Sequence, residues 1–327
     1  MSSASRPPAV PAFSEPPEVH ADYLEFSAIA AAGELVSWER YARDLAIGGS
    51  IDASEDADYR APEEFGPKDY IFRDDEKLEA LLDAVSHELE ERARACGSGK
   101  TVPAYPFEVS RSGVTAYDTG VEDRYLVYDF LLLLSLLGKD AGAAGANAER
   151  LFEDLSRLAL HEYLGGPSRS ADAVVFGFPR RLLPPGFPDA VDDLCARLSE
   201  GGSHRDVPES VDQKDAHLDL VGWRAFPDGR TSKLIFFGQC ATGSNWRSKL
   251  TELQPDGWCK AWLREPLAVN PVRAYFLPHR VDRDLWRTAA IYGGVLFDRC
   301  RVVWLIDGMD QALRDELRAW VNSVLSP

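Results

Sequence analysis

Three polar residues in the C-terminal half have the types and the spacing of a metal-assisted hydrolytic site. Asp219 lies in one predicted strand, Gln239 ends the next, and Lys249 follows ten residues later. A Pro-Asp-Gly turn at 227–229 joins the two strands, which predicts a hairpin with Asp219 and Gln239 at neighbouring positions. Carboxylate and amide oxygens can hold Mg²⁺, and a nearby cation can face a phosphate. The pattern therefore predicts phosphodiester hydrolysis.

Both oxygen-bearing residues interrupt apolar strand faces. Two-residue alternation places Asp219 on the face of His217, Val221 and Trp223, and Gln239 on the face of Ile235, Phe237 and Ala241. A buried acid needs a partner. A structural explanation stays open for each: Asp219 could pair with Arg224, and the Gln239 amide could satisfy a loop backbone.

The helix predicted over 146–164 offers a third oxygen ligand. Glu153 is the candidate, although Arg150 and Arg157 at i−3 and i+4 also fit the ordinary pattern of a solvated helix face. Glu162 is the alternative carboxylate on this helix. Lys249 stands in the first turn of a helix that Ser244 or Asn245 could cap, and Arg247 is the reserve cation.

This arrangement resembles the PD-(D/E)XK, or restriction-endonuclease-like, nucleases, and most of all their Mrr-like branch. In these proteins a strand aspartate is followed on the adjoining strand by Glu or Gln, one spacer residue and Lys. A Phe-Glu pair in the preceding helix, here Phe152-Glu153, often joins the metal shell. The resemblance covers roughly residues 145–306. The chain departs from the pattern at Ala241, where the lysine would stand, so Lys249 is its displaced replacement.

The resemblance implies a restriction-endonuclease-like core, with a mixed central sheet flanked by helices, and a Mg²⁺-dependent endodeoxyribonuclease that also accepts Mn²⁺. Glu153, Asp219 and Gln239 would bind the metal, and Lys249 would stabilise the phosphate charge. DNA would be the substrate, in a prokaryotic antiviral defence or DNA-processing system. Ala241 also fits a second reading, a catalytically inactive scaffold or protein-interaction subunit with the same fold.

Three regions are predicted along the chain. Residues 1–20 form a Pro-rich tail expected to be disordered, 21–115 an acidic helical region, and 120–327 the α/β nuclease-like domain. The helical region would dock a protein partner, regulate the enzyme or form a homo-oligomer. Helices are predicted at 124–137, 146–164, 187–198 and 311–324, and strands at 173–178, 217–225, 232–241, 272–277 and 301–306.

The charge is distributed unevenly. The net charge of −17 argues against a nucleic-acid partner at first sight, because phosphates attract Lys and Arg. Residues 220–304, however, carry 13 Lys and Arg against 7 Asp and Glu. The part of the chain that holds the hairpin could therefore receive a polyanion.

Other classes of protein lack their signatures. The five cysteines form no CxxC pair and the six histidines no HExxH, so zinc or dithiol chemistry is not expected. No P-loop, dinucleotide-binding or GxSxG motif occurs. The longest apolar run is far shorter than the roughly 20 residues of a membrane span, and the N-terminus does not read as a signal peptide. We expect a cytoplasmic protein with reduced thiols and no membrane span.

Overall fold

A mixed five-stranded sheet organises the C-terminal half in the computed structural model, which describes residues 8–52, 67–97, 99, 104–118, 122–142, 147–207 and 213–325. The strands are β4 (Ala171–Val175), β5 (Leu220–Arg224), β6 (Leu234–Cys240), β7 (Val272–Phe276) and β8 (Val295–Phe297). They lie side by side in chain order. The β4–β5 and β5–β6 pairs are antiparallel, whereas β6–β7 and β7–β8 are parallel. The predicted α/β fold with a mixed sheet is confirmed.

The predicted hairpin is present. β5 and β6 pair with Leu220 opposite Gly238, and the turn between them is closed by a 3.2 Å hydrogen bond from the Gly229 amide to the Phe226 carbonyl. Gly229 has a φ of 65°, which a residue without a Cβ adopts at little cost. Asp219 precedes β5 directly and therefore lies beside Gln239 along the backbone.

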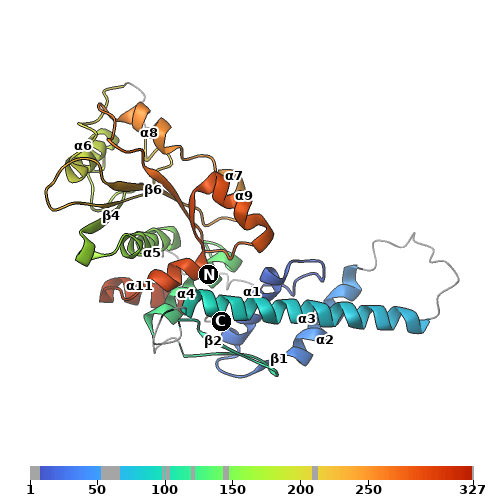
Figure 1. Ribbon diagram of the computed structural model, residues 1–327. Coiled ribbons are helices and arrows are strands. Elements are labelled where there is room, and N and C mark those ends of the chain that lie inside the picture. Colours follow the sequence, from blue (N-terminus) through green and yellow to red (C-terminus); the bar gives the residue numbers. More distant parts are fainter. Residues whose placement is uncertain are drawn as a thin grey trace.

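Helices cover both faces of this sheet (Figure 1). Helix α5 (Ala148–Tyr163) packs on one face, and α6 (Phe187–Leu198) and α8 (Pro255–Trp262) pack on the other. Strand β6 is buried from both sides, so its residues alternate between two cores: Phe236 belongs to the α5 side, and Ile235 and Phe237 to the α6 and α8 side. The short helices η1 (Pro167–Arg169) and α7 (Trp246–Lys249), with α9 (Arg283–Gly293), complete this half.

The predicted strand 301–306 is wrong. This apolar run forms helix α10 (Arg299–Leu305), and the strand at this edge is the preceding β8. The Asp298 side chain accepts a 3.1 Å hydrogen bond from the Arg301 amide and caps the helix. Val302 and Val303 are fully buried in the main core. A short apolar run buried on most sides has no clear period, so tertiary packing decided its conformation.

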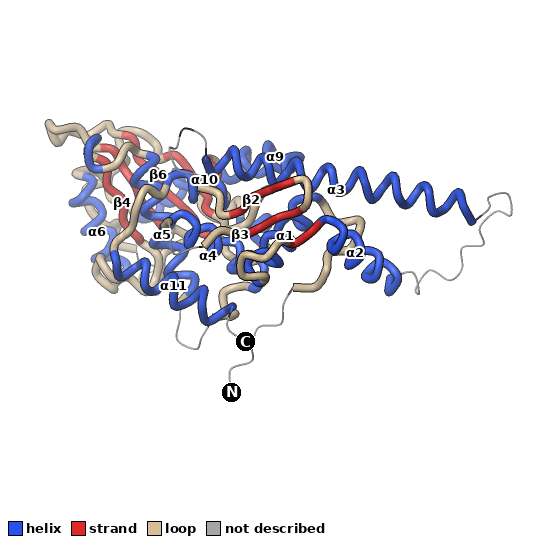
Figure 2. Tube along the Cα trace, turned by 90° about the horizontal axis from the view of Figure 1, so that it is seen from below, coloured by secondary structure: helices blue, strands red, loops and turns tan. Residues whose placement is uncertain are grey.

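The N-terminal region contains a small sheet as well as helices. Helices α1 (Pro17–Ala30), α2 (Trp38–Asp52) and α3 (Pro67–Gly97) accompany strands β1 (Val36–Ser37), β2 (Phe107–Ser110) and β3 (Gly113–Ala116). The strands form an antiparallel sheet in the order β1-β3-β2, beside these helices (Figure 2). The predicted helical region thus also holds strands, and α1 begins inside the predicted tail 1–20, of which residues 1–7 lie outside the described residues.

One hydrophobic core joins the N-terminal region to the rest of the chain. Helices α4 (Asp123–Leu137) and α11 (Gln311–Leu325) contribute to it together with α1, α3, α5 and α10. Among the described helices, none combines the length and the apolar content that a membrane crossing needs.

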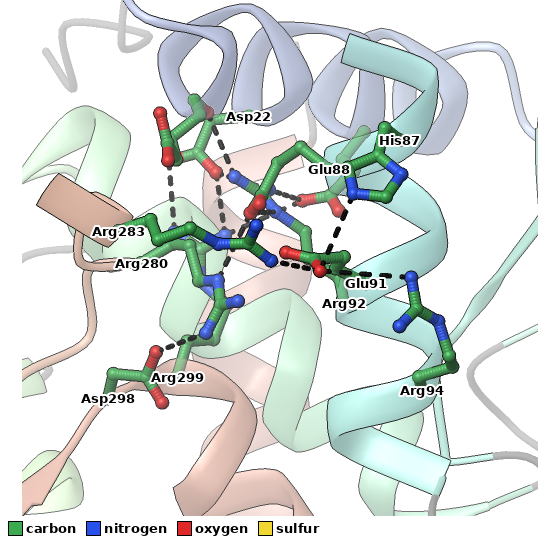
Figure 3. Close-up of polar contacts among 12 residues, drawn as sticks. Asp22, His87, Glu88, Glu91, Arg92, Arg94, Arg280, Arg283, Asp298 and Arg299 are labelled. Carbon is green, nitrogen blue, oxygen red and sulfur yellow. Dashed lines mark hydrogen bonds and ion pairs between the residues drawn. The ribbon is translucent and has the colours of Figure 1, made fainter. Parts of the chain in front are cut away.

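A buried ion cluster reinforces this junction (Figure 3). Arg92 of α3 donates to Asp22 and Glu25 of α1 at 2.6 and 2.8 Å. Arg299 of α10 donates to both Asp22 carboxylate oxygens at 2.8 and 3.0 Å. Both arginines are 0% exposed, so each needs its carboxylate partners. The N-terminal helices are therefore tied to α10, which packs against α5.

Candidate functional site

A cavity of about 330 Å³ lies where the N-terminal half of α5 meets the start of β5 and the end of β6. Its walls include Glu153 from α5, Asp219 before β5, and Cys240 and Thr242 at the end of β6 and just beyond. The segment after β4 closes another side with Phe178 and neighbouring residues. Two of the residues that the sequence singled out, Glu153 and Asp219, are brought together here.

Asp219 is held by hydrogen bonds to two chain segments, the end of β6 and the residues just after β4. Its amide donates to the Gly238 carbonyl at 3.0 Å, and its carbonyl accepts from the amides of Phe176 and Gly177 at 2.7 and 3.0 Å. Its carboxylate Oδ2 accepts from the Cys240 amide at 2.7 Å. Asp219 precedes β5, so its side chain does not have to follow the alternation of side chains between the two faces of the strand. It can therefore turn into the cavity.

Gly177 leaves the space that the two carboxylates share. A Cβ atom built on Gly177 would lie 3.3 Å from Glu153 Oε1 and 3.5 Å from Asp219 Oδ1. Both acidic oxygens therefore face the same point. The backbone of Gly177 is itself bonded to Asp219, so any larger residue here would project between the two acids.

Both carboxyls have raised pKa values. Burial, followed by the negative charge of Asp219, raises the pKa of Glu153 to about 8. Burial also raises the pKa of Asp219 to about 7; the charge of Asp215 acts in the same direction, whereas the Cys240 amide and the positive charge of Lys249 oppose it. Two acids that resist ionisation in one cavity would be stabilised as carboxylates by a cation.

Gln239 points elsewhere. It is 4% exposed, and its Nε2 donates to Glu252 Oε2 at 2.8 Å. Its Oε1 is buried without a hydrogen-bond partner among the residues that the structure describes. The next residue, Cys240, belongs to the α5 side of β6, so Gln239 lies on the opposite side, towards α8. Asp219 and Gln239 are neighbours along the backbone, but Gln239 does not line the cavity.

The remaining predicted residues lie outside the cavity walls. Lys249 is the last residue of α7, and its positive charge acts to lower the pKa of Asp219. Arg247 is exposed and its guanidinium lies 5.5 Å from the Trp246 ring centroid. Glu162 lies near the C-terminal end of α5, where its Oε1 is 3.1 Å from His161 Nδ1. Of the two helix carboxylates, Glu153 is the one beside Asp219.

The sequence reading missed several residues of the cavity. At the end of β6, the sequence predicted that Gln239 and Ala241 would face the site. Instead Cys240 and Thr242, which lie two residues apart, line the cavity. Burial raises the pKa of the Cys240 thiol well above its usual range, so it is neutral. The alternation of side chains along β6 predicted that the strand has two faces. Only the position of α5 shows which of these faces borders Glu153 and Asp219.

Three arginines border the cavity from two sides. Arg150 pairs with Glu316, and Arg181 pairs with Asp154. Arg180 stacks on Phe176, with its guanidinium carbon 4.7 Å from the ring centroid. Their cations stand around an acidic centre, an arrangement suited to a phosphate group that itself contacts a metal ion.

The donor set fits Mg²⁺ better than a transition metal. Mg²⁺ is usually held by one or two carboxylates while water and substrate phosphates supply its other ligands, and Glu153 and Asp219 provide two such groups. Within the described ranges no three His, Cys, Asp or Glu side chains converge on a metal site.

Comparison of the chain with protein-family models, with curated proteins and with solved structures gave no match.

Proposed function

We propose that this chain is a Mg²⁺-dependent phosphodiesterase that cleaves DNA, with Glu153 and Asp219 as the metal-binding pair. The juxtaposition of these two acids across Gly177 carries the proposal. It agrees with the PD-(D/E)XK resemblance, which pairs a strand aspartate with a glutamate of the helix before the sheet. Glu153 and Asp219 would hold Mg²⁺ or Mn²⁺, which would supply Lewis-acid chemistry for phosphodiester hydrolysis.

The chain's own residues supply binding and charge. Glu153 and Asp219 would lose their protons on holding the ion, because its charge would outweigh the burial that raises their pKa values. Arg150 and Arg181 contact the phosphates that flank the scissile bond. Lys249 places a positive charge within electrostatic reach of Asp219 and of the developing phosphate charge. Gln239 orders the strand end through Glu252.

The test is cleavage of plasmid and single-stranded DNA by the purified chain in Mg²⁺ or Mn²⁺. Glu153→Gln and Asp219→Asn should each lower the rate by at least about 100-fold, as for loss of one charge-stabilising group. Glu162→Gln is the matched control, because this carboxylate is on the same helix but outside the cavity. Cutting that survives both site variants would refute the proposal.

A non-catalytic scaffold is the second candidate. It is favoured by Cys240 and Thr242, two uncharged residues on the β6 side of the cavity, where a further acid and a cation would strengthen a hydrolytic site. The same assay separates the two candidates. DNA binding that persists without cleavage in Mg²⁺ and in Mn²⁺ would support the scaffold.

A further inference from the structure

Phe178 is an exposed aromatic residue at the wall of the acidic cavity. Its side chain is 47% exposed, although it lines the same cavity as Glu153 and Asp219. It belongs to none of the hydrophobic core clusters. Isolated exposed apolar residues are common on protein surfaces, so exposure alone assigns no role. The surroundings of Phe178 set it apart.

The backbone around Phe178 is braced. The amides of Phe176 and Gly177, just before it, donate to the Asp219 carbonyl. Just after it, Arg180 stacks on the Phe176 ring, donates to the Pro185 carbonyl at 3.0 Å and bonds the Lys214 carbonyl. A ring presented to solvent from a braced segment costs little entropy when it binds a ligand.

Cations flank this ring. The Lys214 ammonium lies 5.8 Å from the Phe178 ring centroid, and Arg150 and Arg181 line the same cavity. Single-stranded nucleic acids are bound by this combination, in which aromatic side chains stack on bases while cations follow the backbone.

The size of the cavity restricts the substrate further. Its volume of about 330 Å³ is at the small end of ligand pockets, and the two acids lie partly buried inside it. A base that enters a pocket of this kind comes from a single strand or is turned out of the duplex.

We propose that Phe178 is the stacking platform for an unpaired base, so that the chain selects single-stranded or locally unpaired DNA. This inference rests on the proposed function, because it places the phosphate next to that base at the cavity that Glu153 and Asp219 line. Phe178 then selects single-stranded over duplex DNA, because its ring stacks on the exposed face of an unpaired base. In a duplex that face is covered by the neighbouring bases.

The experiment measures binding without cleavage. A short oligonucleotide carrying 2-aminopurine is titrated with the full chain in Ca²⁺ and in EDTA, as a single strand and as a duplex. We expect the single strand to bind at least tenfold more tightly than the duplex, with quenched fluorescence. Phe178→Ala and Phe178→Leu should each weaken single-strand binding about tenfold, or about 1.4 kcal/mol, and remove the quenching, because each removes the ring on which the base stacks.

Two further variants keep the test specific. Phe178→Trp preserves an aromatic face and should bind within about twofold of the wild type. Phe226→Ala removes a ring that is 60% exposed at the turn of the β5–β6 hairpin, at the far end of β5 from Asp219, and should leave binding unchanged. Urea unfolding of each variant checks that the fold is intact.

The outcomes separate this inference from the proposed function. Equal binding of single strand and duplex, or wild-type binding by Phe178→Leu, overturns the stacking role even if the chain cuts DNA. Stacking that depends on Phe178 in a chain that never cuts supports the inference and refutes only the nuclease.

Discussion

Glu153→Gln tests the electrostatics of the candidate site directly. The pKa of this carboxyl is about 8 in the folded chain, against 4.5 for an unperturbed glutamate. The folded state thus binds the proton more tightly than the unfolded state, so its contribution to stability is complete below pH 4.5 and is lost as the pH rises towards 8. A rise from 4.5 to about 8, at about 1.4 kcal/mol per unit, sets an upper limit of about 5 kcal/mol. Rearrangement and water entry should leave about 1–3 kcal/mol.

The assay is urea unfolding in EDTA at intervals from pH 5 to pH 9. The wild type should lose stability across this range, and Glu153→Gln should lose about 1–3 kcal/mol less because glutamine does not ionise. Glu162→Gln, on the same helix, should follow the wild type. Addition of Mg²⁺ at pH 8 should restore stability to the wild type by binding only the folded state, and should have little effect on Glu153→Gln.

Two results would refute this reasoning. A wild-type stability that stays level between pH 5 and pH 9 would mean that burial and the charge of Asp219 do not raise the pKa of Glu153. A Glu153→Gln variant that keeps the full Mg²⁺ stabilisation would mean that the ion binds elsewhere.

Four other changes have defined outcomes. Gly177→Ala should weaken Mg²⁺ binding at least about tenfold in calorimetry, because its Cβ would lie 3.3 Å from Glu153 Oε1. The control Gly257→Ala, whose Cβ would have its nearest contact at 3.6 Å, should leave Mg²⁺ binding unchanged. Gln239→Ala should keep Mg²⁺ affinity within about twofold. It should lose roughly 1–2 kcal/mol of unfolding free energy, because Glu252 loses the hydrogen bond that Gln239 donates. A large loss of Mg²⁺ affinity would mean that Gln239 binds the metal ion after all. Cys240→Asp should tighten Mg²⁺ binding about tenfold by adding a third carboxylate to the cavity, and no gain would place residue 240 out of reach of the ion. Arg299→Met should cost about 3–5 kcal/mol in urea unfolding because it removes one of the two buried arginines that pair with Asp22. Exposed Arg287→Met should cost under about 0.5 kcal/mol, and equal effects would discount the ion cluster.

The ion cluster also bears on the predicted role of the N-terminal region. Its helices share a core with α4 and α10, and Arg92 and Arg299 bind the same carboxylate of Asp22. Removal of this region would expose that core and take away the carboxylates of Asp22 and Glu25 that pair with Arg299. A protein partner or a second copy of the chain would therefore meet the outer surface of a region built into the fold.

Local signals in the sequence were sufficient for the hairpin and for most helices. The Pro-Asp-Gly turn and the two-residue period of the flanking strands depend only on residues close in the chain, and α5 is readable from its helical period. The α/β class followed from the same signals. The run at 301–306 failed because a short apolar segment has no period that separates a strand from a buried helix.

Only the tertiary structure decided which side chains meet. Alternation along β6 separates Gln239 from Cys240, but the position of α5 determines that Cys240 borders the acids and that Gln239 faces Glu252. The pairing of Glu153 with Asp219 depends on Gly177, which lies between them and carries no chemistry of its own. Contacts between residues far apart in the chain depend on how helices pack on a sheet, and no local pattern encodes that packing. The sequence therefore determined the elements and the candidate residues, and packing chose among them.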